Sequence, residues 1–333
     1  MPSSTPQAPD GARLARRLRD GDLTAAPAVL NLVENRSPAA REAIADLLRG
    51  VSPGALGGEA RGHVIGVTGP PGSGKSTLLS AVVRRWRADG RSVAVLAVDP
   101  SSQRSGGALL GDRARITSGA HDGRTFIRST AAGDRLGGLA PATRAAAHAL
   151  AAAFDVVVVE TVGVGQSETE VAQVADTVAV IVQPGSGDAL QFLKSGIMEI
   201  PDVLVVTKAD LGPIALRARR DLGAALRSAG SRGTAVVAVS AVASPPVGLD
   251  ELVAALDAHR ASLDLPARRL ASRRASALAD FTAEHGERGL RTLGGRRAAR
   301  RLLHELAPGD DIPSIVRSLE DRTAGDGTPG AEG

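Results

Sequence analysis

The stretch VIGVTGPPGSGKSTLLSAVV, residues 64–83, decides the fold. It joins a short β-branched run, a glycine-rich turn and a helical pattern, and it contains the arrangement G-x-x-x-x-G-K-[ST]. The glycines let backbone N–H groups point at phosphate oxygens, and the helix adds its positive N-terminal end. We therefore expect a phosphate-binding loop built from Gly69, Pro70, Pro71, Gly72, Ser73, Gly74, Lys75, Ser76 and Thr77.

Two side chains of this loop have predicted chemical roles. The ammonium group of Lys75 is expected to reach the β- and γ-phosphates, and the hydroxyl group of Ser76 is expected to bind Mg²⁺. A glycine-rich turn without a ligand is the alternative interpretation. That alternative does not explain a Lys-Ser pair at the start of a helix.

Residues 63–260 alternate apolar runs with helical stretches. The runs are VIGVT, VAVLAV, FDVVVVE, TVAVIVQ, VLVVT and AVVAVS. Continuous rather than alternating apolar runs are typical of parallel strands buried on both faces. We predict a doubly wound, mainly parallel α/β sheet with helical N- and C-terminal extensions. Ligands of such sheets bind at the carboxyl ends of the strands.

Four regions follow from the same pattern. Residues 1–62 are expected to form a helical N-terminal subdomain with a glycine-rich connector, and Ser37 is the expected cap of one of its helices. Residues 63–262 form the P-loop domain. Residues 263–322 form a helical C-terminal extension, broken at two glycine- or proline-containing sites, and residues 323–333 form a disordered tail.

Acidic residues follow two of the predicted strands. Asp99 ends one strand and Glu160 ends another, where a carboxylate beside a P-loop can hold Mg²⁺ or its waters. The backbone N–H of Gly163 is placed to meet the γ-phosphate. Asp112 lies in a glycine-rich loop of the kind that rearranges when the γ-phosphate is lost, and the residues alone leave its role open. For each acid by itself, a helix cap or a surface carboxylate is the alternative interpretation, but together with the P-loop the acids are expected to form a site.

The run Thr207-Lys208-Ala209-Asp210 follows another strand and indicates the base. A carboxylate at its fourth position accepts hydrogen bonds from the N1–H and 2-amino groups of guanine, while adenine leaves that carboxylate unpaired. The lysine stem packs along the base. Threonine replaces the commoner asparagine and removes an amide that braces the loop. A backbone N–H for guanine O6 is expected from the segment Ser240, Ala241 and Val242.

The positions of the lysines and the rate of hydrolysis are two further points of the sequence. The rare lysines are expected where an arginine guanidinium would not serve. Only three of the 40 basic residues are lysines, and two of them, Lys75 and Lys208, fall in nucleotide motifs. The third is Lys194. No residue is an obvious base for the attacking water, although Gln166 is a candidate. We expect slow intrinsic turnover that rises when a partner orders the loops.

Composition excludes several classes of protein. The chain has no cysteine and a polar start, so we expect no disulfides, no thiolate metal site and a cytoplasmic location. No run of about 18–20 apolar residues predicts a membrane helix. The isoelectric point is near 10.4, but the formal net charge is only +4 and aromatic residues make up 2%, so we expect no nucleic-acid partner.

The ordered motifs resemble a known family. GPPGSGKST, VLAVDPSS, GALLGDRAR, VVVVETVGVGQSE, PGSGDALQFLKSGI and TKAD are similar to the MeaB/ArgK-type GTPases associated with methylmalonyl-CoA mutase, over roughly residues 20–260. The resemblance implies a homodimeric GTPase that acts as a chaperone for an adenosylcobalamin-dependent mutase, in cofactor loading, protection or reactivation. The C-terminal helices, which form a dimer arm in relatives, match less well.

The resemblance also implies roles for individual residues. Asp99, Asp112 and Glu160 are expected around magnesium, and residues 185–194 form a switch that senses nucleotide and partner, with Lys194 inside it. Two other functions stay open. A GTPase metallochaperone would need a ligand cluster that six histidines without cysteine do not clearly form, and a P-loop small-molecule kinase would need an acceptor pocket.

Overall fold

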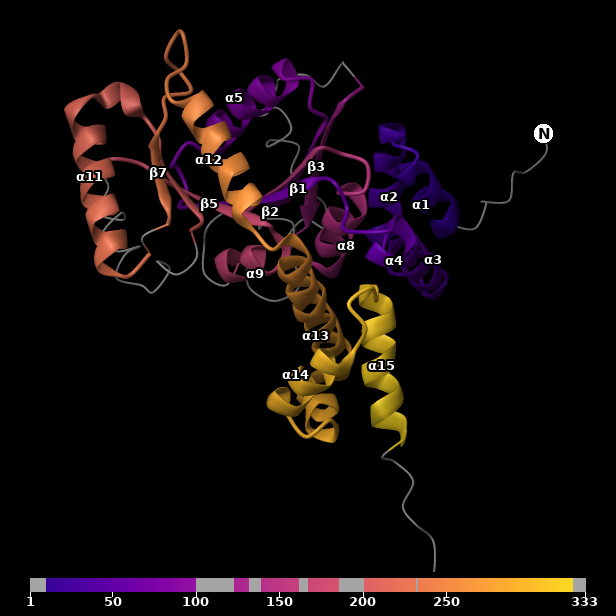
Figure 1. The fold of residues 1–333 in the computed structure, drawn as a ribbon. Helices are drawn as coiled ribbons and strands as arrows, with labels where there is room; N and C mark the ends of the chain where they lie inside the picture. Colours follow the sequence, from indigo (N-terminus) through magenta and orange to yellow (C-terminus); the bar gives the residue numbers. More distant parts are fainter. Residues whose placement is uncertain are drawn as a thin grey trace, which may run out of the picture.

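A seven-stranded sheet forms the centre of the protein, and a helical lobe projects from it (Figure 1). The computed structural model describes residues 10–99, 123–131, 139–161, 167–185, 201–231 and 233–325. All pairings between neighbouring strands of this sheet are parallel. The strands are β1 (His63–Thr68), β2 (Val93–Asp99), β3 (Thr125–Ala131), β4 (Val156–Glu160), β5 (Thr177–Val182), β6 (Val203–Val206) and β7 (Ala235–Ala238).

The strand order confirms the predicted doubly wound sheet. It runs β3-β2-β4-β1-β5-β6-β7, which places β1 and the P-loop in the middle, between β4 and β5. The six predicted apolar runs all become strands, but β3 was not predicted. Its sequence, TFIRSTA, mixes polar and apolar residues without a continuous apolar run, and residues 125–129 are only half-buried because β3 is an edge strand of the sheet.

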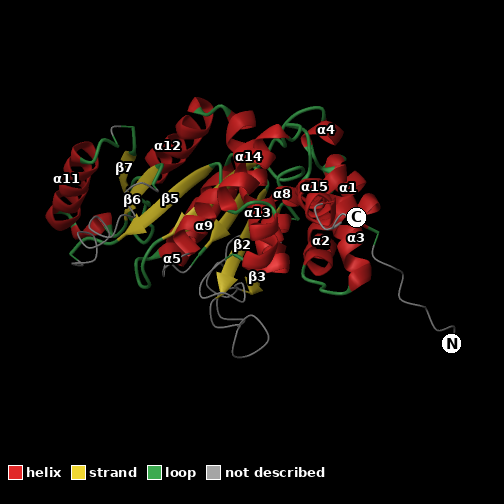
Figure 2. Ribbon diagram, turned by 90° about the horizontal axis from the view of Figure 1, so that it is seen from below, coloured by secondary structure: helices red, strands yellow, loops and turns green. Residues whose placement is uncertain are grey.

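Helices cover both faces of the sheet (Figure 2). One face is covered by α5 (Lys75–Ala88) and α12 (Leu249–Ser262), whose apolar side chains, Trp86 among them, share a cluster with the strands. The other face carries α8 (Pro141–Leu150), α9 (Ser167–Val174) and α11 (Pro213–Ser228). Each fully buried aliphatic or aromatic side chain contributes roughly 1.5–3 kcal/mol through burial.

The N-terminal helices pack into this second cluster. They are α1 (Gly11–Arg19), the 3₁₀ helix η1 (Leu23–Ala25), α2 (Ala26–Val33), α3 (Pro38–Gly50) and α4 (Pro53–Leu56). The Ser37 hydroxyl caps α3 by accepting from the Ala40 backbone N–H at 3.3 Å, as its sequence predicts. Leu30 and Leu47 belong to the same apolar cluster as Val157 of β4. These helices therefore share a core with the sheet, and the boundary at residue 62 remains a prediction.

The C-terminal lobe has a core of its own. It consists of α13 (Leu265–Thr292), α14 (Arg296–Glu305) and α15 (Ile312–Gly325), and the apolar side chains of the three helices, such as Phe281, pack together. The helices break where glycines and Pro308 predict, and α13 also bends at Gly286, whose φ is 61°. No helix in the described part of the chain is long and apolar enough to cross a membrane.

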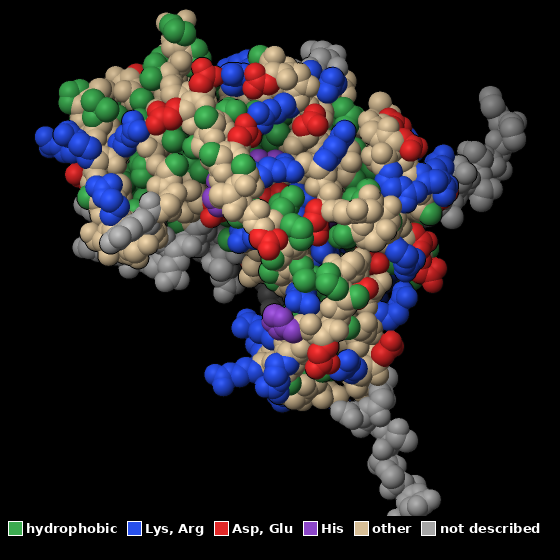
Figure 3. Space-filling view, viewed as in Figure 1, with side chains coloured by type: hydrophobic (Ala, Val, Ile, Leu, Met, Phe, Trp, Pro, Cys, Tyr) green, Lys and Arg blue, Asp and Glu red, His purple; other side chains and the backbone are tan. Residues whose placement is uncertain are grey.

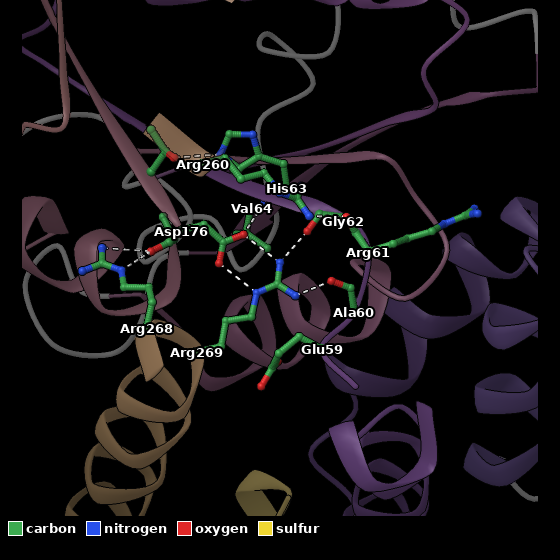
Figure 4. Close-up of polar contacts among 12 residues, drawn as sticks. Glu59, Ala60, Arg61, Gly62, His63, Val64, Asp176, Arg260, Arg268 and Arg269 are labelled. Atoms are coloured by element: carbon green, nitrogen blue, oxygen red, sulfur yellow. Dashed lines mark hydrogen bonds and ion pairs between the residues drawn. The ribbon is translucent and has the colours of Figure 1, made fainter. Parts of the chain in front are cut away.

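Ion pairs join the first half of α13 to the sheet domain (Figure 4). The Arg269 guanidinium donates to both Asp176 oxygens, at 2.8 and 2.7 Å, and also to the carbonyls of Ala60 and Gly62. One turn further along α13, the Arg273 guanidinium binds Glu59 at 3.0 Å. The lobe is thus attached to the start of β1 mainly through charged and polar groups.

Candidate functional site

The phosphate-binding loop lies between β1 and α5, at the carboxyl end of the central strand. Gly69 and Gly74 have φ values of 148° and 89°, which side chains rarely tolerate. A Cβ atom on Gly69 would lie 2.1 Å from the Ile181 carbonyl oxygen of β5. Only glycine therefore allows the loop to turn this close to the neighbouring strand.

Lys75 opens α5 with its ammonium group turned back over the loop. Its Nζ donates to the Gly69 carbonyl at 2.7 Å and to the Pro70 carbonyl at 3.0 Å. Phosphate oxygens are stronger acceptors for an ammonium than neutral carbonyls, so this geometry suits an exchange of partners when nucleotide binds. Ser76 is partly exposed in the first helical turn, and Thr77 is exposed beside it.

Two of the acids predicted to bind magnesium end neighbouring strands, β4 and β2, and β4 is paired with β1. Glu160 ends β4 opposite Val67 of β1 and Ala97 of β2, and it is 8% exposed. Asp99 lies two residues beyond Ala97 on β2; its side chain is outside the described part. A hydroxyl from Ser76 with carboxylates on two strand ends is a donor set that Mg²⁺ prefers, so the residues fit this ion.

Thr161 ties the end of β4 to the end of β1. Its backbone N–H donates to the Val67 carbonyl at 2.9 Å, and its hydroxyl group hydrogen-bonds the Thr68 hydroxyl at 3.0 Å. Both threonines are fully buried. Sequence reasoning missed this pair, although each threonine directly follows an apolar strand run, which is the available signal.

Several predicted residues lie outside the described residues. They are Asp112, Gly163, Gln166 and Lys194. Their roles stay predictions, as does the proposed switch beyond Gly185.

The base motif is braced against the phosphate loop by its first residue. The Thr207 hydroxyl donates to the Ser73 carbonyl at 2.7 Å, and Val182 offers a second carbonyl at 3.1 Å. Thr207 is 5% exposed. The sequence analysis expected that threonine removes a brace from the base loop. In the structure the Thr207 hydroxyl instead joins the base loop to the phosphate loop through its hydrogen bond to Ser73.

Lys208 and Asp210 face the carboxyl edge of the sheet. Among the described residues Lys208 is the one non-glycine with a positive φ, at 54°, a conformation that costs energy and is often found at functional sites. Its Nζ donates to the Gln183 side chain at 2.6 Å. Asp210 is exposed, and one of its oxygens accepts from the Ser240 hydroxyl at 2.5 Å. Gln183, directly after β5, was not predicted.

The remaining base-loop residues follow β7. Ser240 is fully buried, Ala241 is partly exposed and Val242 is 71% exposed. The backbone here is held by paired hydrogen bonds of 3.0 Å between Ser240 and Val247. The structure thus brings the phosphate loop, Glu160, the 207–210 segment and Ser240 together at the carboxyl ends of β1, β4, β6 and β7, where doubly wound sheets bind ligands.

Comparison with known proteins gives a consistent picture. Residues 26–288 match the family model described as methylmalonyl Co-A mutase-associated GTPase MeaB. A protein of Pyrococcus abyssi, named as a candidate GTPase, is 42% identical over 265 residues, covering 78% of this chain and 79% of that protein. The mouse mitochondrial methylmalonic aciduria type A homolog is 41% identical over 157 residues, 47% of this chain and 38% of that protein.

A solved structure covers nearly all of the chain. The crystal structure of a LAO/AO transport system kinase superposes with a TM-score of 0.62 at 28% identity, covering 96% of this chain and 99% of that one. The match includes both helical extensions as well as the sheet, because it spans almost the full length of both proteins.

Proposed function

Because the chain belongs to the methylmalonyl-CoA mutase-associated GTPase family, we propose that it acts as a chaperone for an adenosylcobalamin-dependent mutase. It is a P-loop GTPase, as its relatives and fold indicate. The finer role is to couple GTP hydrolysis to loading, protection or reactivation of the mutase. The family description supports a mutase partner, and the name of the mouse relative refers to methylmalonic aciduria.

One observation carries the nucleotide assignment: the hydrogen bond from Thr207 to the Ser73 carbonyl. It fixes the base loop relative to the phosphate loop, so one nucleotide can contact both. Asp210 then faces the ligand with a carboxylate that Ser240 orients. That carboxylate matches the two adjacent donors of guanine and opposes the acceptor of adenine.

In this proposal each residue around the phosphates has one task. Ser76, Asp99 and Glu160 would hold Mg²⁺, and the ion would offset charge that develops on the phosphates. Lys75 leaves the loop carbonyls and binds the β- and γ-phosphates as a compact point charge. Asp112 keeps its predicted place around magnesium, Gly163 at the γ-phosphate, Gln166 as a candidate for positioning the attacking water, and Lys194 in the switch.

The two other candidate functions gain no support. One group of described residues has the spacing of metal ligands, namely Glu284, His285 and Glu320. Glu284 already accepts from Arg41 at 2.8 Å, and His285 and Glu320 lie 3.0 Å apart as a pair. A kinase has no use for a guanine-reading loop. Homodimerisation and a cytoplasmic location remain parts of the proposal that follow from the resemblance.

The decisive measurement is phosphate release from GTP by the purified chain, alone and with purified methylmalonyl-CoA mutase of the same organism. We expect slow turnover that the mutase accelerates, because a partner must order the switch. The Lys75→Arg variant, assayed with the mutase, controls for contaminating hydrolases. Rapid turnover that the mutase leaves unchanged would contradict the chaperone role.

A further inference from the structure

One side of α14 is covered with cations. Four of its ten residues are arginines, all exposed, and at 3.6 residues per turn they project within an arc of about 140°. The other side of the helix enters the core of the lobe through Ala299 and Leu303, which are 0% and 3% exposed. The cationic face consists of Arg296, Arg297, Arg300 and Arg301.

This face has little counter-charge in the lobe. Arg296 pairs with Glu287 at 2.6 Å, but no carboxylate among the described residues pairs with the other three arginines. Two more exposed arginines, Arg288 and Arg291, lie nearby in sequence at the end of α13. Figure 3 shows Lys and Arg side chains gathered on the tip of the projecting lobe.

Some half-buried arginines elsewhere are matched with acids. Arg91 binds Asp257 at 2.6 Å and Arg219 binds Glu251 at 2.8 Å, both across two helices or a helix and a loop. In α14, by contrast, arginines repeat at i and i+4, an arrangement that disfavours an isolated helix by a few tenths of a kcal/mol per pair. Among the described residues of the lobe, the Arg296–Glu287 pair is the one ion pair that offsets this repulsion on the cationic face.

We propose that the cationic face of α14 docks an acidic surface of the partner enzyme. The inference rests on the proposed function, which supplies a protein partner. Arginine is enriched at protein interfaces, and complementary charge speeds encounter and selects the correct partner. Two copies of this chain cannot pair symmetrically through this face, because two cationic faces repel each other.

The surroundings favour a protein over nucleic acid or membrane. The apolar side of α14 is already buried in the lobe, so it cannot insert into a bilayer. Phe281, the aromatic residue of the described lobe, is fully buried and cannot stack on bases. Glu287 and Glu305 flank the face and interrupt any track for a continuous polyanion.

The lobe also contacts the helix that follows the metal-side strand. Arg268 of α13 donates to the carbonyls of Ala172 and Ala175 at 3.2 and 3.1 Å, at the end of α9. This helix begins seven residues after Glu160. A partner bound to α14 is therefore bound to a lobe that contacts α9, the helix that follows the strand of Glu160.

The test compares two charge reversals in the full chain. R297E/R300E/R301E changes the cationic face, and R217E/R220E/R227E changes three exposed arginines of α11 that likewise have no ion pair among the described residues. Each lowers the formal charge by six. Binding of purified methylmalonyl-CoA mutase of the same organism is measured by surface plasmon resonance at roughly 0.05 and 0.2 M salt.

We expect the α14 reversal to weaken mutase binding at least tenfold and to reduce the salt dependence, while the α11 reversal changes affinity less than twofold. Basal GTP hydrolysis should be the same in both variants and wild type. Equal mutase affinity of the two reversals would overturn the docking assignment but not the proposed function. No binding by wild type would overturn both.

The same variants are tested against a short DNA duplex and phosphatidylglycerol vesicles. Neither should bind wild type at the higher salt concentration. The proposal is wrong if the DNA or the vesicles bind wild type and lose affinity on the α14 reversal while mutase affinity is unchanged by it. The face would then be a site for that polyanion.

Discussion

The two edges of the sheet use polar and charged residues in opposite ways. At the carboxyl edge, Lys75, Lys208 and Asp210 contact loop groups and remain at least partly exposed. At the amino edge, Asp176 and Arg269 are buried, with side-chain exposures of 1% and 7%. The first set can exchange its contacts for a ligand, whereas the second set is already satisfied by the fold.

The amino edge is closed by a dense hydrogen-bond network. Asp176 accepts from the Val64 backbone N–H at 2.9 Å in addition to Arg269. Burial alone raises the pKa of the Asp176 carboxyl, but the hydrogen bonds and charge of Arg269 more than offset this and hold the pKa below its usual value. A charged residue beside the sheet is therefore not a sign of function by itself. Its position at the amino or the carboxyl ends of the strands indicates whether it is structural or available to a ligand.

A chain of side chains continues along this edge. The His63 Nε2 lies 2.7 Å from the Thr177 hydroxyl, which lies 2.8 Å from the His259 Nδ1. The His259 Nε2 in turn lies 3.2 Å from Asp202. These groups link β1, β5 and α12 and bind one another, which is the arrangement of a structural network.

Breaking the buried ion pair should have the largest effect on the amino edge. Arg269→Met leaves Asp176 buried and uncompensated, and we expect a loss of about 3–5 kcal/mol in the free energy of unfolding. Urea denaturation measures it, and GTP affinity of the folded fraction should stay unchanged. The matched control is Arg268→Met, whose partly exposed guanidinium binds only backbone carbonyls; an equal loss in that variant would contradict the distinction.

The converse change lies at the carboxyl edge. Lys75→Arg keeps the charge but replaces a compact ammonium with a planar fork, and we expect GTP turnover to fall about 100-fold or more. Thermal unfolding should change little, because Lys75 is partly exposed and hydrogen-bonds carbonyls of its own loop. Arg84→Lys, exposed on the same helix, is the control and should retain full activity.

The sequence predicts the carboxyl edge far better than the amino edge, for a physical reason. GPPGSGKS and TKAD are contiguous, and their glycines and strand context define the local backbone. Asp176 and Arg269 are 93 residues apart, belong to no motif and meet only because α13 returns to the start of β1. The Thr207 brace was missed for a similar reason, since its direction toward Ser73 depends on the order of the strands.

Base selection is expected to change less than turnover. Asp210→Asn replaces an acceptor with a donor opposite the guanine 2-amino group, and a hydrogen bond to a charged group contributes about 1.5–3 kcal/mol, or roughly tenfold or more in affinity. Titration with fluorescent GTP, ATP and XTP checks this; XTP should partly restore binding because its 2-oxo group accepts. Asp221→Asn, exposed on α11, should bind as wild type. Equal GTP and ATP affinity in wild type would refute guanine selectivity.

The smallest expected effect is a pH dependence that belongs to the amino edge alone. Burial is the main cause that lowers the pKa of His63 to about 3, outweighing the opposite pull of Asp176 and Asp257 and aided by Arg260 and Arg269. Between the unfolded value of about 6.5 and this folded value, only the unfolded chain binds the proton, so stability is complete above pH 6.5 and is lost as pH falls.

From pH 6.5 to 5 this histidine should lower the free energy of unfolding by about 1–2 kcal/mol. His63→Gln can keep a hydrogen bond to Thr177 but cannot titrate, so its unfolding free energy should show a shallower slope than wild type over that interval. His304→Gln, an exposed histidine of α14, is the control and should keep the wild-type slope. If the His63 variant keeps the wild-type slope as well, burial at the amino edge does not keep His63 unprotonated. The two edges would then differ in their contacts but not in their access to solvent.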